Sequence, residues 1–217
     1  MNETERRKGE HIRLCLEEKV TGERITAGFE RYRFRHQALP EIDFETIDTG
    51  TEWLAKPLKV PLLISSMTGG TSEAERINLN LAEAAESRGW AMGLGSVRAG
   101  VERPELARTY RVRSVAPSIP IIANLGAVQL NYGYGADECR RAVDLAEADA
   151  LVLHLNAMQE IFQPEGNTNF SGLLKKIEAV CKALSVPVGV KEGGWGIGGD
   201  TAVRLAEAGV RFIDVAG

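Results

Sequence analysis

The chain has 217 residues, of which 44% are hydrophobic and 26% are charged, a composition typical of one globular domain. Its formal charge of −4 gives no sign of the basic surface that nucleic-acid binding needs. The polar start MNETERRKGEH lacks the apolar core of a secretory signal, and no apolar run approaches the ~20 residues of a membrane helix. Three widely separated cysteines, Cys15, Cys139 and Cys181, indicate reduced thiols, so we expect a soluble cytoplasmic protein.

Residues 1–60 are interpreted as a lead-in segment before the main domain. The apolar residues of HIRLCLEEKV, at 11–20, recur at helical spacing and predict a helix. The stretch 21–60 predicts irregular structure with room for a strand, and nothing in it marks a separate domain.

Short apolar runs recur through the remainder of the chain, residues 61–217. Their nearly continuous hydrophobicity is typical of parallel strands buried on both faces. Amphipathic stretches with helix signals lie between them, so the pattern predicts successive strand–helix units. The predicted strands are PLLISSM (61–67), WAMGLGS (90–96), PIIANLG (120–126), ALVLHLN (150–156), PVGVKE (187–192) and FIDVAG (212–217).

The predicted helices begin at polar residues that can cap them. Ser72 followed by Glu75 matches a capping box, and the helix would end at Gly89. Ser171 and Asp200 are expected to be N-caps of two later helices.

The fold class expected from this alternation is α/β, a (β/α)₈ barrel of which the chain carries about six units. A complete barrel has eight units in about 250 residues. Six strands would also suit a doubly wound open sheet. The barrel is favoured because every predicted strand ends in a polar or glycine-rich turn, as barrel strands do at the catalytic face. The chain stops at Gly217, directly after a strand.

The first three strand ends carry small and polar groups. SSMTGG, at 65–70, lets backbone approach a flat ligand. Ser96 and Arg98 pair a hydroxyl with a guanidinium, which suits phosphate, and Asn124 offers a donor and an acceptor in one plane. Taken singly, each is equally typical of a tight turn or a surface loop.

The fourth strand end, LHLNAMQE, is the most informative. Alternation along the strand places His154 and Asn156 on one face, and Gln159 and Glu160 follow in the loop. A lone histidine is more often a core residue than a catalyst. Four polar groups at one strand tip favour a functional site. Glu160 is an oxygen ligand of the type that Mg²⁺ accepts.

The fifth strand end, VKEGGWGIGGD, matches G-x-G-x-x-G through Gly194, Gly196 and Gly199. A dinucleotide site with Asp214 on the ribose is a possible interpretation. It is rejected because a lone motif has many false matches and because the dinucleotide-binding unit normally opens its domain. Lys191, a cation closing an apolar strand, is the better candidate, since it can stabilise a developing anion.

The N-terminal stretch RRKGEH places Arg7, Lys8 and His11 at the start of the predicted helix. These cations could fold over a polyanion. A solvated, frayed terminus is the competing interpretation.

Taken together, several stretches resemble one family. RKGEH, ALPEID, SSMTGG, GLGSVRA, ANLGAVQLNYGYG, LHLNAMQE, QPEGNTNFSGL and VKEGG followed by FIDVAG are similar, in this order, to type 2 isopentenyl-diphosphate isomerases, the FMN-dependent kind. The resemblance runs through nearly the whole chain. LHLN-x-x-QE together with SSMTGG is far more specific than any single glycine motif.

The resemblance implies a (β/α)₈ barrel in a homo-oligomer, a tetramer or octamer, that interconverts isopentenyl and dimethylallyl diphosphates with FMN, NADPH and Mg²⁺. Reduced flavin would act as acid and base, with Gln159, Lys191 and His154 as the catalytic residues and Glu160 on the metal. The residues implied to contact FMN are Ser66, Met67, Thr68, Ser96, Asn124 and Lys191. Those implied to face the substrate are Arg7, Lys8, Arg98, His154, Asn156 and Gln159.

Two departures from the family pattern matter. The family has V-G after KE and a serine near the next helix, whereas this chain has Gly193 and GIGGD. The family also continues past VAG with AGGTSW and two further units, which would hold the FMN phosphate. Two other functions therefore remain: a different FMN barrel, such as a hydroxy-acid oxidase, and an inactive truncated subunit.

Overall fold

The computed structural model describes residues 3–20, 26 and 28–215, with side chains from residue 9 onward. The strands are β1 Thr51–Trp53, β2 Lys56–Leu58, β3 Leu63–Ile64, β4 Ala91–Ser96, β5 Ile121–Gly126, β6 Ala150–Leu155, β7 Val188–Glu192 and β8 Phe212–Asp214. The α-helices are α1 Glu3–Glu17, α2 Ser72–Arg88, α3 Arg98–Glu102, α4 Ala136–Ala146, α5 Ala157–Phe162, α6 Leu173–Ala183 and α7 Gly199–Glu207. Four 3-10 helices complete the set: η1 Phe29–Arg31, η2 Phe44–Thr46, η3 Pro104–Tyr110 and η4 Ala127–Asn131.

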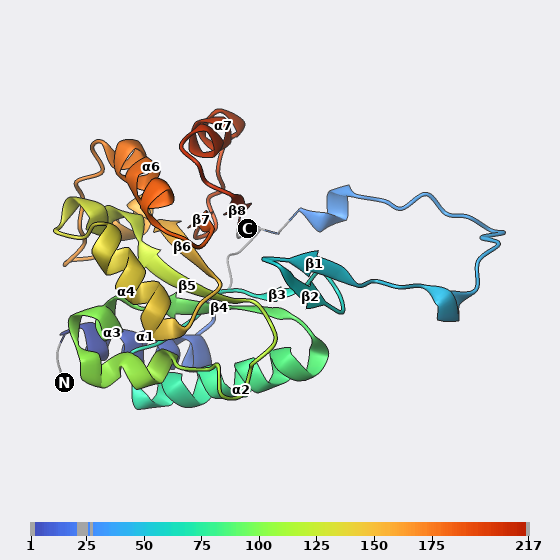
Figure 1. The fold of residues 1–217 in the computed structure, drawn as a ribbon, viewed down its shortest axis with the longest axis horizontal. Coiled ribbons are helices and arrows are strands. Elements are labelled where there is room, and N and C mark those ends of the chain that lie inside the picture. Colours follow the sequence, from blue (N-terminus) through green and yellow to red (C-terminus); the bar gives the residue numbers. More distant parts are fainter. Residues whose placement is uncertain (1–2, 21–25, 27, 216–217) are drawn as a thin grey trace.

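Strands β3 to β8 form one six-stranded sheet in the order of the sequence, and every neighbouring pair is parallel. The sheet curls, and α2, α4, α6 and α7 lie outside it (Figure 1). All six predicted strands are confirmed, although β3 and β8 are shorter than their apolar runs. A curled parallel sheet of sequential units is the architecture of a (β/α) barrel, and six of its eight units are present.

The main core fills the space between the sheet and these helices. Strands β4 and β5 are buried along almost their whole length, which explains their unbroken apolar sequence. The largest fully buried side chains of this core come from the strands, α6, the loops and η3, and include Tyr110, Met92, Leu94, Ile121, Leu125, Leu151, Leu153 and Ile177.

A second, smaller cluster lies on the other face of the sheet and is closed by the β1–β2 hairpin. Its buried residues come from β5 and β6, and the hairpin contributes Trp53 and Leu54. The Trp53 ring packs edge-on against Phe212, with ring centroids 5.3 Å apart. Gly189 of β7 makes room for this arrangement, because a Cβ there would lie 2.2 Å from the Phe212 ring.

The turn of the β1–β2 hairpin consists of Leu54 and Ala55, with φ of 53° and 57°. Positive φ at both central positions matches the twist of a two-residue hairpin, where Asn-Gly is the usual pair. Each non-glycine residue in this left-handed conformation lowers the stability of the fold by about 1–2 kcal/mol. Packing of Leu54 against the second cluster offsets part of this cost.

Asp149, at the end of the α4–β6 connection, links four segments at the N-terminal end of the sheet. Its Oδ2 accepts from the Ile121 N–H at 2.8 Å and from the Arg113 guanidinium at 2.9 Å. Its Oδ1 pairs with the Lys56 Nζ of β2 at 2.9 Å. Burial alone would raise the pKa of Asp149, but these donors lower it below its ordinary value.

The helix starts differ from those predicted. Thr71 caps α2 by accepting from the Ala74 N–H, so Ser72 is the first helical residue and not the cap. Glu75 pairs with Arg108 instead of closing a capping box.

The expected caps of α6 and α7 are also wrong. Gly172 and Gly198 occupy the N-cap positions, and neither helix has a side-chain cap bond. Ser171 lies one residue further out, where its N–H donates to the Asn169 side chain, and Asp200 lies inside the first turn. A glycine at φ 68°, as at Gly172, turns the chain into the helix without a capping side chain.

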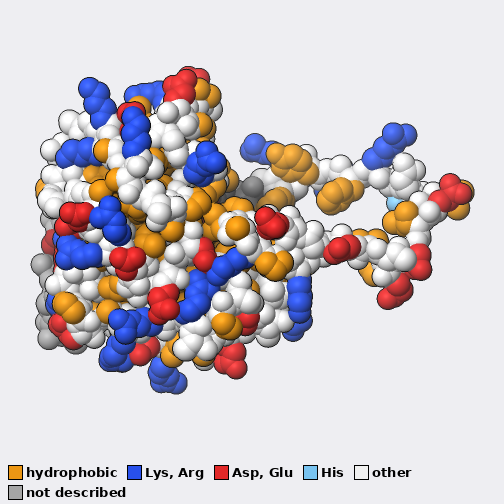
Figure 2. Space-filling model, in the orientation of Figure 1, with side chains coloured by type: hydrophobic (Ala, Val, Ile, Leu, Met, Phe, Trp, Pro, Cys, Tyr) orange, Lys and Arg blue, Asp and Glu red, His pale blue; other side chains and the backbone are white. Residues whose placement is uncertain are grey.

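The N-terminal segment confirms the predicted helix, which ends at Glu17 before Val20. Residues 28–50 extend away from the sheet and carry exposed apolar side chains (Figure 2), among them Phe29, Tyr32 and Phe34. None of the helices in the described ranges is long and apolar enough to cross a bilayer. The division of the chain at residue 60 stays a prediction.

We expect Asp149→Asn to lower the free energy of unfolding by about 2–4 kcal/mol, because it leaves half-buried cations without their anion. The folded-state pKa of Asp149 is depressed, so its contribution is complete above the unfolded-state pKa of about 3.9 and is lost as the pH falls through the folded value. Urea unfolding at pH 7 and pH 3 measures both effects. Asp137→Asn, which removes an exposed ion pair on α4, is the control and should change stability by less than about 1 kcal/mol. An Asp149→Asn protein as stable as its parent would contradict this role.

Candidate active site at the carboxyl ends of the strands

A cavity of about 450 Å³ lies at the carboxyl ends of the sheet strands. It brings together all eleven predicted site residues whose side chains are described: Ser66, Met67, Thr68, Ser96, Arg98, Asn124, His154, Asn156, Gln159, Glu160 and Lys191. They lie in β4 to β7 or in the segments that directly follow β3, β4 and β6. Arg7 and Lys8 lie within α1, but their side chains are outside the described residues.

The segment that follows β3 reaches the cavity because glycines in β4 let it approach. A Cβ at Gly95 would lie 2.4 Å from the Thr68 backbone, and a Cβ at Gly93 would lie 2.7 Å from Ser66 Oγ. The Gly95 N–H donates to the Thr68 carbonyl at 3.2 Å, and Asn78 Nδ2 donates to the same carbonyl at 3.2 Å. The backbone of residues 66–68 is therefore held at the edge of the cavity.

Asn124 and Lys191 are the buried polar side chains that β5 and β7 present to the cavity, with exposures of 5% and 7%. Asn124 Oδ1 has no hydrogen-bond partner among the residues the structure describes. Burial lowers the pKa of Lys191, while the Asp214 and Glu192 carboxylates raise it. A buried acceptor and a buried cation that line the same cavity suit a ligand with a donor and an anionic edge.

His154 lies on β6 beside Lys191 in the parallel register. Burial and the Lys191 charge lower the pKa of His154 to about 4, although Glu192 opposes the shift. The imidazole is therefore neutral at pH 7, with one donor and one acceptor nitrogen. Gly193, where the family pattern has valine, leaves room for it, because a Cβ there would lie 3.3 Å from His154 Nε2.

Helix α5 places Gln159 and Glu160 at the cavity, with Asn156 at its N-cap position. Both Glu160 oxygens accept hydrogen bonds, Oε1 from Asn156 Nδ2 at 2.7 Å and Oε2 from the Asn167 N–H at 2.6 Å. A carboxylate has about four lone-pair sites, so the two bonds leave acceptor capacity on both oxygens. Within the described part of the chain, no three His, Cys, Asp or Glu side chains cluster as a metal site.

Arg98 and Ser96 line the cavity after β4, as predicted. Arg98 Nε pairs with Glu102 one turn along α3 at 2.6 Å, which orients its guanidinium. The Tyr110 hydroxyl donates to the Ser96 carbonyl at 2.9 Å and fixes the end of β4.

Some cavity residues were missed by the sequence interpretation. Gln129 follows β5 in the run GAVQL, where its apolar neighbours concealed it, and Gln163 lies in the loop after α5. Helix α1 contributes His11, which the sequence marked only as a possible anion contact, together with Ile12 and Leu16. Helical spacing identified these apolar positions but not the surface that they face.

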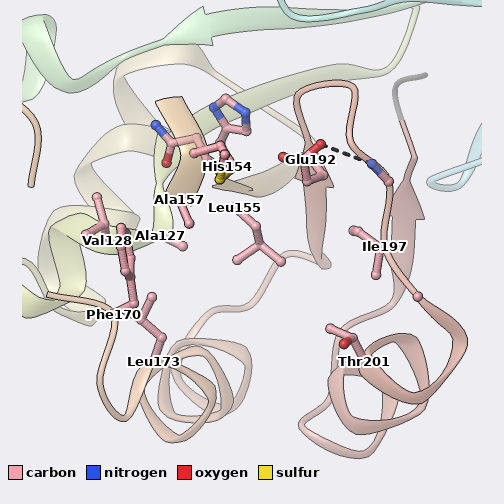
Figure 3. A pocket seen from close by; sticks show the side chains of 14 residues that line it. Ala127, Val128, His154, Leu155, Ala157, Phe170, Leu173, Glu192, Ile197 and Thr201 are labelled. Atoms are coloured by element: carbon pink, nitrogen blue, oxygen red, sulfur yellow. Dashed lines mark hydrogen bonds between the residues drawn. The ribbon is translucent and has the colours of Figure 1, made fainter. Parts of the chain in front are cut away.

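A smaller cavity of about 280 Å³ shares His154 and Asn156 with the larger one. Figure 3 shows Phe170 and Leu173 on one side of it and Ile197 and Thr201 on the other, with a backbone N–H bonded to Glu192. Its lining is mainly apolar, so the larger cavity is the candidate site for polar chemistry.

The curled parallel sheet with polar strand ends defines a class, the (β/α)₈ barrels. The family model described as FMN-dependent dehydrogenase matches residues 2–108. A lactate oxidase of Pediococcus acidilactici superposes with a TM-score of 0.56 at 18% identity, over 86% of this chain and 54% of that one. This likeness confirms the predicted barrel fold.

Two curated relatives identify the family more closely. An isopentenyl-diphosphate delta-isomerase of Synechocystis is 58% identical over the whole chain, and one of Oceanobacillus iheyensis is 54% identical over 97% of it. The resemblance carried by the motifs is thus confirmed: the chain is similar along its whole length to proteins named isopentenyl-diphosphate delta-isomerase. It spans about three fifths of their length, 62% and 60% of these two proteins.

We expect Lys191→Met to weaken FMN binding about 10- to 100-fold, because a charge-assisted contact contributes about 1.5–3 kcal/mol. Lys182→Met, which removes an exposed cation on α6, is the control and should leave the affinity unchanged. Flavin fluorescence quenching during titration with FMN measures both. Equal affinities in the two variants would contradict a flavin contact at Lys191.

We expect the His154 imidazole to stay neutral down to about pH 5 in the ligand-free protein, since burial and Lys191 lower its pKa. Stability should fall as the pH drops from about 6.5 to about 4, because over this range the unfolded chain takes up the proton and the folded His154 does not. Carbon-bound imidazole proton shifts measured by NMR from pH 4 to 8 test this, with the resonance assigned by its loss in His154→Gln. A midpoint near 6.5 would show that the ring is solvated.

Proposed function

We propose that the protein interconverts isopentenyl and dimethylallyl diphosphates with reduced FMN. The observation that supports this most directly is the single cavity that collects the eleven residues implied by the family motifs. The isomerases that the chain resembles match it along its whole length, although it spans only part of theirs.

The residues present fit a flavin. Asn124 Oδ1, buried and without a partner among the described residues, would accept from a ring N–H, and the buried Lys191 cation would hold an anionic ring edge. The backbone of residues 66–68, packed closely on Gly93 and Gly95, leaves a shallow surface for a flat ring. Bound reduced FMN supplies the acid and base chemistry of the double-bond shift.

The residues present also fit Mg²⁺. Glu160 supplies a carboxylate at the cavity, and Asn156 Oδ1 lies buried beside it without a hydrogen-bond partner in the described chain. Mg²⁺ prefers oxygen ligands and keeps several waters, so one carboxylate with diphosphate oxygens is a sufficient ligand set.

The remaining polar residues bind and orient the substrate. Arg98, with Arg7 and Lys8 of α1, would contact the diphosphate, while the neutral His154 donates a hydrogen bond to a phosphate oxygen. Gln159, in the first turn of α5, orients the reacting end of the substrate. An unactivated alkene is a poor base, so it needs a close proton donor and exclusion of water. Helix α1 contributes Ile12 to the lining of the cavity.

Three further features belong to the proposal. NADPH would reduce the flavin before the first turnover. The protein would act in the cytoplasm as a homo-oligomer, a tetramer or octamer.

The test is conversion of isopentenyl diphosphate to dimethylallyl diphosphate, followed by NMR with FMN, NADPH and MgCl₂ under nitrogen. We expect turnover that chelation of the metal abolishes. Glu160→Gln should reduce turnover at saturating Mg²⁺ by about 100-fold, since a bound metal stabilises the charge of the transition state by several kcal/mol. Glu165→Gln, an exposed carboxylate in the loop after α5, is the matched control.

A hydroxy-acid oxidase is the second candidate, favoured by the FMN-dependent dehydrogenase model and by the lactate oxidase fold. Oxygen consumption with L-lactate tests it. Lactate oxidation without isomerisation would replace the proposed function, and a protein that takes up no flavin would indicate an inactive subunit.

A further inference from the structure

Gln129 is a buried polar residue that the proposed reaction does not yet use. It lies in η4, directly after β5, with 4% of its surface exposed, and it lines the larger cavity. Its Nε2 donates to Asn167 Oδ1 at 3.0 Å. Its Oε1 has no partner in the part of the chain that is described. A buried amide oxygen facing a cavity is costly unless a ligand or water donates to it.

Asn167 connects Gln129 to the carboxylate of Glu160. The Asn167 side chain accepts from Gln129, and its backbone N–H donates to Glu160 Oε2 at 2.6 Å. The loop can approach this closely because residue 166 is glycine, where a Cβ would lie 1.7 Å from the Glu160 carbonyl oxygen. Gln129 therefore fixes the Asn167 segment, and this segment in turn fixes the Glu160 carboxylate.

Asn156 completes the arrangement from the opposite side. Its Nδ2 donates to Glu160 Oε1 at 2.7 Å, and its Oδ1, like Gln129 Oε1, is buried without a described partner. The Glu160 carboxylate is thus fixed by two donors, and the two amide oxygens without described partners belong to residues that line the same cavity. Amide oxygens accept hydrogen bonds and cannot donate them, so they fit the hydrogens of cation-bound water.

We propose that Gln129 and Asn167 are positioning residues for a hydrated divalent cation on Glu160. Through Asn167, Gln129 fixes the carboxylate, and its Oε1, together with Asn156 Oδ1, accepts hydrogen bonds from water on the cation. Such partners of ligating groups typically contribute 10- to 100-fold in metal affinity. The inference rests on the proposed function insofar as Glu160 binds the metal.

The test is direct cation binding rather than turnover. Mn²⁺ is titrated into the FMN-loaded protein without added diphosphate, which would itself bind Mn²⁺, and free Mn²⁺ is measured by electron paramagnetic resonance. We expect Gln129→Met, which keeps the side-chain volume and removes both polar atoms, to weaken Mn²⁺ binding at least 10-fold. Gln37→Met, an exposed glutamine before β1, is the matched control and should leave it unchanged.

Substitutions at Asn167 separate positioning from simple loss of packing. Asn167→Asp keeps the oxygen that accepts from Gln129 and should bind Mn²⁺ at least as tightly as the parent. Asn167→Ala removes that oxygen and should weaken binding, though by no more than Gln129→Met, which also removes Oε1. Because Gln129 reaches Glu160 only through Asn167, the double variant should bind no more weakly than Gln129→Met alone.

Three outcomes would overturn the inference: unchanged Mn²⁺ affinity in Gln129→Met, weakening in Asn167→Asp equal to that in Asn167→Ala, or additive losses in the double variant. Glu160→Gln distinguishes this failure from that of the proposed function. If Glu160→Gln also leaves Mn²⁺ binding unchanged, the metal role of Glu160 is wrong. If it alone weakens binding, the metal role stands and only the positioning role of Gln129 and Asn167 is wrong.

Discussion

The parallel direction of all six sheet strands is the constraint on which the rest of the structure depends. Parallel strands end at one edge of the sheet, so every turn that follows a strand delivers its side chains to the same region. Asn124, His154 and Lys191 come from three neighbouring strands and meet at one cavity for this reason alone. No long-range motif is needed to assemble the site, because the sheet places each strand end next to the following one.

The two ends of the sheet have different tasks. At the N-terminal end, the Asp149 carboxylate accepts hydrogen bonds from β2, from β5 and from Arg113. The β1–β2 hairpin packs its Trp53 ring against Phe212 of β8. These polar groups are paired, so this end contributes stability. At the carboxyl end, Asn124, Gln129, His154 and Asn156 have buried atoms without described partners, the arrangement expected where a ligand completes the hydrogen bonds.

Much of the fold and site could be predicted from sequence, because apolar runs report strands and polar residues at their ends report the cavity. The runs around Ile121 and Ala150 located β5 and β6 to within a residue. The N-cap residues were harder to predict. The geometry of the loop that enters each helix places Thr71, Gly172 and Gly198 at the N-cap positions, and a local sequence pattern does not contain that geometry. Gln129 was missed since its burial and its bond to Asn167 depend on a loop distant in sequence.

The glycines of β4 show how little freedom the site has to change. At Gly93 and Gly95 the Ser66 hydroxyl and the Thr68 backbone occupy the space that a Cβ would need, so the absence of two side chains shapes the binding surface. A substitution there would not remove a functional group, yet it would displace the backbone that a planar ligand lies against. Sequence variation is therefore restricted at residues with no chemistry of their own, and a mutational scan would detect the outline of the site through its smallest residues as clearly as through its charged ones.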